Sequence, residues 1–188
     1  MNKMLTIVFA TALLTACAAP VSNESNEKTV FVTSESFYGN LGGLEGADEK
    51  CQAEASAPAS IVPSGTYMAW LSDGTDSPDS RFTKSSHPYV LPDGTKIAEN
   101  YTDLTDGTIQ RVINIDPTGK TLGKNLFWTA TNSDGTTAQQ LQTCSGWVNP
   151  YTGARGMVGS TSETSTSWSS YQQSRCNTIP NRLACFQQ

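Results

Sequence analysis

The chain has 188 residues with 17 acidic and 12 basic side chains, which gives a net charge of -5. This charge disfavours nucleic acids and acidic polysaccharides as partners, because both are attracted to basic surfaces. The single histidine, His87, excludes metal sites built from several histidines. His87 has no nucleophile motif near it, and the many loop carboxylates define no catalytic pair. The sequence therefore predicts a protein that is not an enzyme and needs no cofactor.

Residues 1–16 predict a lipoprotein signal peptide. Lys3 precedes an apolar stretch over 5–14, and Leu14-Thr15-Ala16-Cys17 has the small-residue pattern found before an acylated cysteine. An ordinary secretory signal cut near Ala16 or Ala18 is the alternative. Acylation of Cys17, palmitate included, would anchor the exported chain in a membrane. Ala18, rather than Asp, after the cysteine favours the outer membrane of a Gram-negative cell, and residues 17–28 then form the acylated cysteine and a polar tether.

The remaining cysteines, Cys51, Cys144, Cys176 and Cys185, form an even set in an oxidising compartment. Two disulfides are expected, and the sequence alone allows three connectivities. Zinc is disfavoured because the set lacks the closely spaced cysteine pairs typical of structural zinc sites.

Residues 29–188 predict one domain, which opens with a strand of β-branched and aromatic residues over 29–33. A helix is expected over 44–57, because Leu44, Ala47, Cys51 and Ala55 recur at helical spacing before Pro58. A buried strand should follow over 65–71, and shorter strands over 89–91, 112–115, 127–130 and 183–186. Between Cys144 and Cys176 the chain is poor in aliphatic residues, which predicts a long irregular loop with Trp147 packed under it.

The tripeptide Asp-Gly-Thr occurs four times, starting at residues 73, 93, 106 and 134. One interpretation is a repeated calcium-binding element, and the other is repeated turn chemistry, since Asp-Gly supplies the backbone conformations of tight turns. The irregular spacing of the copies favours turns.

Seven short strings, in order along the chain, resemble the endostatin domain at the end of collagens XV and XVIII. They are GLEGADEKC at 43–51, GTYMAWLS at 65–72, PYV at 88–90, INID at 113–116, Trp128 with Gly135, CSGW at 144–147 and LACF at 183–186. The chain is most similar to bacterial endostatin-like lipoproteins of the leptospiral type. This resemblance implies an α+β, C-type-lectin-like domain with short mixed strands, one main N-terminal helix, long irregular loops and nested disulfides Cys51–Cys185 and Cys144–Cys176.

Departures from the relatives limit what the resemblance implies. Endostatin binds zinc through N-terminal histidines and heparin through clustered arginines, whereas this chain lacks those histidines and its arginines are scattered. The sugar-binding triplets of calcium-dependent lectins are also missing. No metal is therefore expected.

The resemblance implies a non-enzymatic surface module that binds host matrix or plasma proteins, or partners in the cell envelope. Tyr151, Arg155, Trp168 and Tyr171 lie between Cys144 and Cys176 and are of residue types enriched in binding hot spots. For Trp168 the competing interpretation is core packing. The alternative function is calcium-independent carbohydrate binding, with Asn132 and Asp134 beside Trp128 as candidates, although these residues also read as a turn after a buried tryptophan.

Overall fold

The computed structural model describes residues 26–138, 142–148 and 151–188. Cys17, the signal segment 1–16 and the tether as far as residue 25 lie outside the described residues. The elements in chain order are β1 (Lys28–Val32), α1 (Gly43–Ala55), β2 (Tyr67–Ala69), α2 (Pro78–Arg81), β3 (Tyr89–Val90), β4 (Lys96–Ala98), α3 (Tyr101–Leu104), β5 (Leu126–Trp128), β6 (Arg155–Ser160), the 3-10 turn η1 (Thr166–Trp168), β7 (Gln172–Arg175) and β8 (Ala184–Gln187).

β1 is the middle strand of a five-stranded mixed sheet with the order β2-β8-β1-β3-β4. It runs antiparallel to β8 and parallel to β3. Its two faces belong to two apolar clusters. Phe31 packs in the cluster that contains the buried residues of α1, whereas Val30 and Val32 pack in the cluster of Trp70 and Phe186. A strand buried on both faces needs an unbroken apolar run, which explains the consecutive Val30, Phe31 and Val32.

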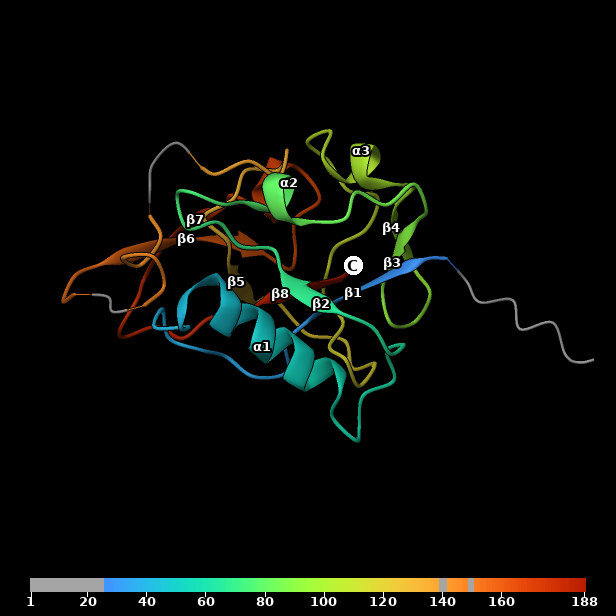
Figure 1. Cartoon of the computed structure of the whole chain (residues 1–188), viewed down its shortest axis with the longest axis horizontal. Coiled ribbons are helices and arrows are strands. Elements are labelled where there is room, and N and C mark those ends of the chain that lie inside the picture. Colours follow the sequence, from blue (N-terminus) through green and yellow to red (C-terminus); the bar gives the residue numbers. More distant parts are fainter. Residues whose placement is uncertain (1–25, 139–141, 149–150) are drawn as a thin grey trace, which may run out of the picture.

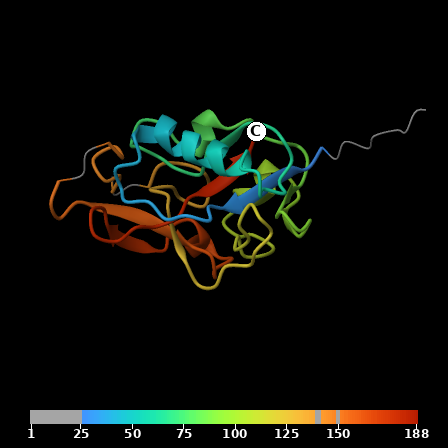
Figure 2. The same cartoon turned by 90° about the horizontal axis from the view of Figure 1, so that it is seen from below.

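α1 covers one side of β1 and β8, as Figure 2 shows. Its buried positions include Leu44, Ala47, Cys51 and Ala55, which confirms the predicted face. The helix ends at Ala55, two residues earlier than predicted, and a turn leads to Pro58. Two of its polar side chains bind the edge strand β2: the Ala69 amide donates to Asp48 Oδ1 at 2.8 Å and the Tyr67 amide donates to Gln52 Oε1 at 3.0 Å.

The prediction of a long irregular loop between Cys144 and Cys176 was wrong. This segment contains β6 and β7, which form a three-stranded antiparallel sheet with β5. The strand predicted over 112–115 is also not formed, and Ile115 makes a single bridge to Thr121 while Ile113 fills the core. Figure 1 shows β6 and β7 at one end of the molecule and β3, β4 and the start of β1 at the other.

Two disulfides join elements that are distant in sequence. Cys51 of α1 pairs with Cys185 of β8, and Cys144 pairs with Cys176 directly after β7. Both pairs match the nested arrangement that the family resemblance implied. Elements of both kinds, mixed sheets and these two disulfides make the fold a small α+β domain, as predicted. Among the residues described, no helix is long and apolar enough to cross a bilayer.

Candidate functional site

The three-stranded sheet has one buried and one partly exposed face. A Cβ atom added at Gly156 would lie 2.7 Å from Cys144 Sγ and 2.9 Å from the Trp128 ring, so this position faces the core. Val158, two residues further along β6, is fully buried on the same side. Because side chains alternate along a strand, Arg155 and Met157 lie on the opposite face.

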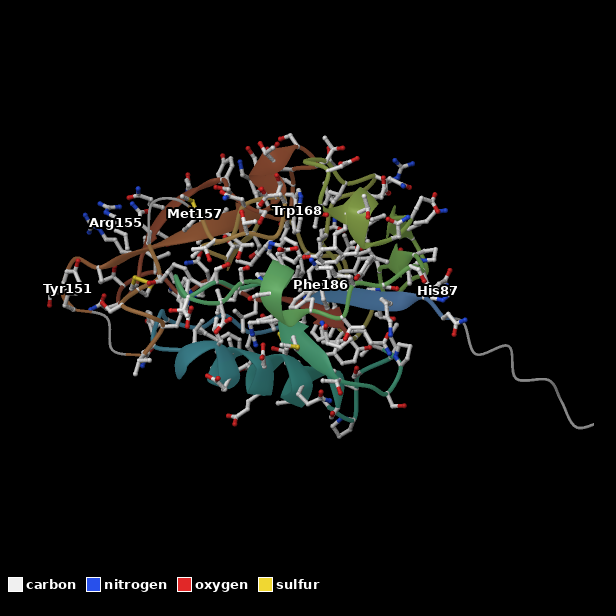
Figure 3. All side chains as sticks on the ribbon, turned by 45° about the horizontal axis from the view of Figure 1, so that its top comes forward. His87, Tyr151, Arg155, Met157, Trp168 and Phe186 are labelled. Carbon is white, nitrogen blue, oxygen red and sulfur yellow. A yellow bond between two sulfur atoms is a disulfide. The ribbon has the colours of Figure 1, made fainter. Side chains whose placement is uncertain are left out.

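On that opposite face, β6 and β7 place their side chains in pairs. Arg155 lies directly opposite Arg175, and Met157 lies opposite Gln173. Both arginines and Gln173 are exposed, and Met157 is half-buried. We call these four residues, with the flanking Tyr151 and Tyr171, the β6–β7 face. Figure 3 shows Tyr151, Arg155 and Met157 together at one end of the molecule.

The two tyrosines are among the exposed large apolar side chains of the protein. Tyr151 is 70% exposed and Tyr171 is 37% exposed. The Tyr171 ring lies under the ammonium group of Lys124, 5.7 Å from Nζ to the ring centroid. Two predicted binding residues therefore flank the strand pair that carries a third, Arg155.

A pocket of about 420 Å³ opens where β6 begins and β7 ends, away from the segment that connects the two strands. Its lining comprises Thr152, Gly153, Arg155, Arg175, Asn177 and Thr178. The Asn177 side-chain amide donates to the Tyr151 carbonyl at 3.3 Å, which ties the two sides of the hairpin end together. Both arginines thus line one concave, polar site.

Acidic and basic residues are distributed unevenly along the chain. Residues 28–116 carry 13 acidic and 6 basic side chains, whereas residues 117–188 carry 2 acidic and 5 basic ones. Ion pairs among the described residues join Arg81 to Asp48, Lys84 to Asp79 and Lys96 to Glu99, all within the acidic half. Within the described chain, Arg155 and Arg175 therefore have no carboxylate partner.

Trp168 does not belong to this surface, because its burial favours the competing interpretation of core packing. Its side chain is fully buried, with its ring centroid 4.9 Å from that of Trp70 and 6.5 Å from that of Phe186. The 3-10 turn η1 places it in the apolar cluster that also contains Trp70 and Phe186. Figure 3 labels Trp168 and Phe186 near the middle of the molecule. Trp147 is also fully buried, and its indole N–H donates to the Ser72 carbonyl at 2.7 Å, so its predicted packing role is confirmed.

The carbohydrate candidates hold a turn together. Asp134 Oδ1 accepts from the Thr136 amide at 2.9 Å, and the Asn132 amide group donates to the Thr137 carbonyl at 3.2 Å. Trp128 is fully buried and donates its indole N–H to the Phe37 carbonyl, so it offers no aromatic surface to a sugar.

All four Asp-Gly-Thr copies adopt the same turn. In each, an aspartate Oδ1 accepts from the threonine amide two residues later, at 2.8 to 3.0 Å. The glycine between them has a positive φ in every copy, which L side chains rarely adopt. This geometry supports the turn interpretation over a repeated calcium element. Residues 26–138, 142–148 and 151–188 contain no group of three His, Cys, Asp or Glu side chains placed to hold a metal ion.

A second, shallower depression of about 820 Å³ lies over α3 and includes Lys84, Asn100, Tyr101 and Asp103. The Tyr101 hydroxyl is buried without a hydrogen-bond partner among the described residues. Burial, reinforced by the nearby carboxylates of Asp79 and Asp134, raises the pKa of this phenol. His87 is exposed and lies at the end of the molecule opposite Tyr151 (Figure 3). Neither place brings together the predicted binding residues.

Comparison with family models matches residues 34–164 to the family described as "Protein of unknown function (DUF1554)". The match spans 131 of the 188 residues. The chain belongs to this family. The matched region covers α1, the strands β2, β3 and β4 of the five-stranded sheet, and β5 and β6 of the smaller sheet. It does not include the two inner strands β1 and β8, and it stops before β7. A search of curated proteins finds no match to the DUF1554 chain.

In this DUF1554 protein, sequence reasoning missed Met157, Gln173 and Arg175 as members of the β6–β7 face. The alternation of Arg155, the small Gly156 and Met157 could have indicated a strand with both larger side chains on one face. No comparable signal identifies Arg175, whose place depends on its pairing with Arg155 across the sheet.

Proposed function

We propose that this protein is a non-enzymatic binding module of the bacterial cell envelope that recognises a protein partner through the β6–β7 face. The observation that carries the proposal is the grouping of exposed Tyr151, Arg155, Tyr171 and Arg175 around one strand pair. Tyrosine and arginine are enriched in the residues that dominate protein interfaces. The resemblance to endostatin-like lipoproteins, with host matrix, plasma or envelope proteins as partners, points to the same class of function.

We further propose that the module is exported and anchored to the outer membrane by acyl groups on Cys17. The chain enters the fold at the start of β1, at the opposite end of the molecule from β6 and β7 (Figure 1). An anchor attached through the N-terminal segment would therefore leave the β6–β7 face pointing away from the membrane. Labelling with a palmitate analogue tests this proposal, since the Cys17→Ser variant should lose both the label and its place in the membrane fraction.

A binding array tests the function itself. The full-length chain, exported so that its disulfides form, is screened against matrix and plasma proteins, envelope proteins and glycans, each with calcium and with chelator. The proposal predicts saturable protein binding that resists chelator and is lost in a Tyr151→Ala, Tyr171→Ala variant. The matched control is Ile61→Ala, which removes a 58% exposed apolar side chain outside the β6–β7 face.

Two results would overturn the proposed function. Protein binding that survives the double tyrosine substitution would place the site elsewhere on the molecule. Binding to glycans alone would favour the carbohydrate alternative, even though the side chains of Asn132 and Asp134 are engaged in a turn.

A further inference from the structure

The Arg155–Arg175 pair is an unusual arrangement within an antiparallel sheet. The Cys176 amide donates to the Ala154 carbonyl at 3.0 Å, one residue beyond the pair on each strand. This pattern makes Arg155 and Arg175 a non-hydrogen-bonded pair, the type in which facing side chains lie closest. Like charges placed directly opposite destabilise a sheet. Within the described chain no carboxylate offsets this repulsion, so an anionic group from outside would relieve it.

The backbone of β7 is the second feature of the site. β7 is the last strand of the sheet order β5-β6-β7. Because Met157 and Gln173 also form a non-hydrogen-bonded pair, two residues along from the arginines, the N–H and C=O groups of Gln173 point away from β6. No described residue pairs with these groups. Such an open edge is a template for an additional strand.

We propose that the β7 edge and the Arg155–Arg175 pair together bind an extended acidic segment of a partner protein, which adds to β7 as a further strand. Backbone hydrogen bonds to Gln173 would hold the segment, as in other cases of strand addition. Alternate side chains of the segment would then lie on the same side as Arg175. Aspartate or glutamate at those positions would meet guanidinium groups that can bind carboxylates through two parallel hydrogen bonds.

The pocket and the charge distribution favour this occupant over a small anion. The pocket continues past the arginines to Asn177 and Thr178, beyond the end of β7, so it can accept the continuation of an extended chain. A free phosphate or a sulfated sugar would engage the arginines but would leave the Gln173 edge unused. This proposal rests on the proposed function, because it assigns the partner's chemistry at the same face.

A peptide-binding experiment with the full-length chain tests the proposal. The probe is a fluorescent peptide of alternating Glu and Thr, and its affinity is measured by anisotropy. One control peptide replaces Glu by Gln, and a second keeps every Glu but carries N-methyl groups on the amides that would face β7. Inorganic phosphate and a sulfated oligosaccharide serve as competitors.

The proposal predicts that the Glu-Thr peptide binds and that both control peptides bind at least about tenfold more weakly. The Arg155→Gln, Arg175→Gln variant should weaken binding by a similar factor. The matched control is Arg111→Gln, Lys120→Gln, which removes the same charge from exposed positions outside the β6–β7 face. Thermal unfolding of each variant verifies that it is folded.

Several outcomes would overturn the proposal. Absence of peptide binding would do so, as would an affinity unchanged by the arginine substitutions. Equal binding of the N-methylated peptide, together with displacement by phosphate or the sulfated oligosaccharide, would show a simple anion site without strand addition. If the wild type does not bind the peptide but binds a protein of the array, and the tyrosine variant no longer binds that protein, this inference is wrong and the proposed function stands. If the tyrosine variant binds the array protein as well as the wild type does, the proposed function is contradicted instead.

Discussion

Arg155 and Arg175 face each other across β6 and β7 without a carboxylate partner among the described residues. A surface arranged only for stability would not place two positive charges in this position. The proposed binding site therefore predicts a cost in folding stability, which can be measured without knowing the partner.

The Arg175→Gln variant should be more stable than the wild type, by a few tenths of a kcal/mol, because it removes the repulsion between opposed charges. The gain should be largest at low ionic strength, where screening is weakest. Urea unfolding at low and high salt measures both effects, with Arg111→Gln as the control for the change in net charge. A loss of stability in Arg175→Gln would mean that Arg175 has a stabilising contact.

Gly39 connects the first loop to the Cys144–Cys176 disulfide. Its amide donates to the Cys176 carbonyl at 2.7 Å, and an added Cβ would lie 2.4 Å from Cys144 Sγ. Gly39→Ala should therefore lower the free energy of unfolding by about 1 to 3 kcal/mol, the usual cost of overpacking a core. Gly123→Ala is the control, because a Cβ there would meet nothing within 4 Å. Equal unfolding midpoints for the two variants would show that the loop yields to the added methyl group.

Truncation of Trp168 should affect stability far more than truncation of Tyr151. Trp168→Ala should destabilise the fold by about 3 to 5 kcal/mol, because the indole fills a buried space beside Trp70. Tyr151→Ala should change stability by less than about 0.5 kcal/mol, because the ring is exposed. Denaturant unfolding measures both values. A stable Trp168→Ala variant would contradict the burial of this side chain.

The Glu54 carboxyl should make stability depend on pH. Burial raises its pKa above the ordinary value of 4.5, although the amides of Ser34 and Glu35 donate to it and oppose the shift. As pH rises from 4.5, the unfolded chain loses this proton before the folded chain does. Stability must therefore fall as pH rises through the folded-state pKa.

The neutral Glu54→Gln variant lacks the contribution of this carboxyl to the pH dependence of stability. Unfolding free energies of both proteins are measured from below pH 4.5 to neutral pH. The free energy of unfolding of the wild type should fall relative to that of the variant as pH rises. If the wild type instead gained relative to the variant over this range, the amide hydrogen bonds would outweigh the burial of the carboxyl.

The sequence was sufficient to predict the elements with strong apolar periodicity. α1 follows from its helical spacing, and β1 from an apolar run that is buried on both faces. β6 was not predicted because two of its six residues are glycines, Gly156 and Gly159, which are buried on opposite faces of the strand against the rings of Trp128 and Phe127. Met157 and Val158 alone give too short an apolar signal to indicate a strand.

The candidate site was predictable only in part, for a related reason. Residue type pointed to Tyr151, Arg155 and Tyr171, but the same reasoning included Trp168, since a tryptophan serves equally well in a binding hot spot or a core. Arg175 enters the site through strand pairing, which depends on a register between segments that sequence inspection had assigned to a loop.

The most direct test of the account is hydrogen exchange measured along the full-length chain, with and without the protein partner that the array identifies. We predict that binding slows amide exchange in residues 151–160 and 171–179, with the strongest effect at Gln173 on the open edge of β7. Slowed exchange confined to α1 or to the depression over α3, with β6 and β7 unchanged, would contradict the assignment of the β6–β7 face as the binding site.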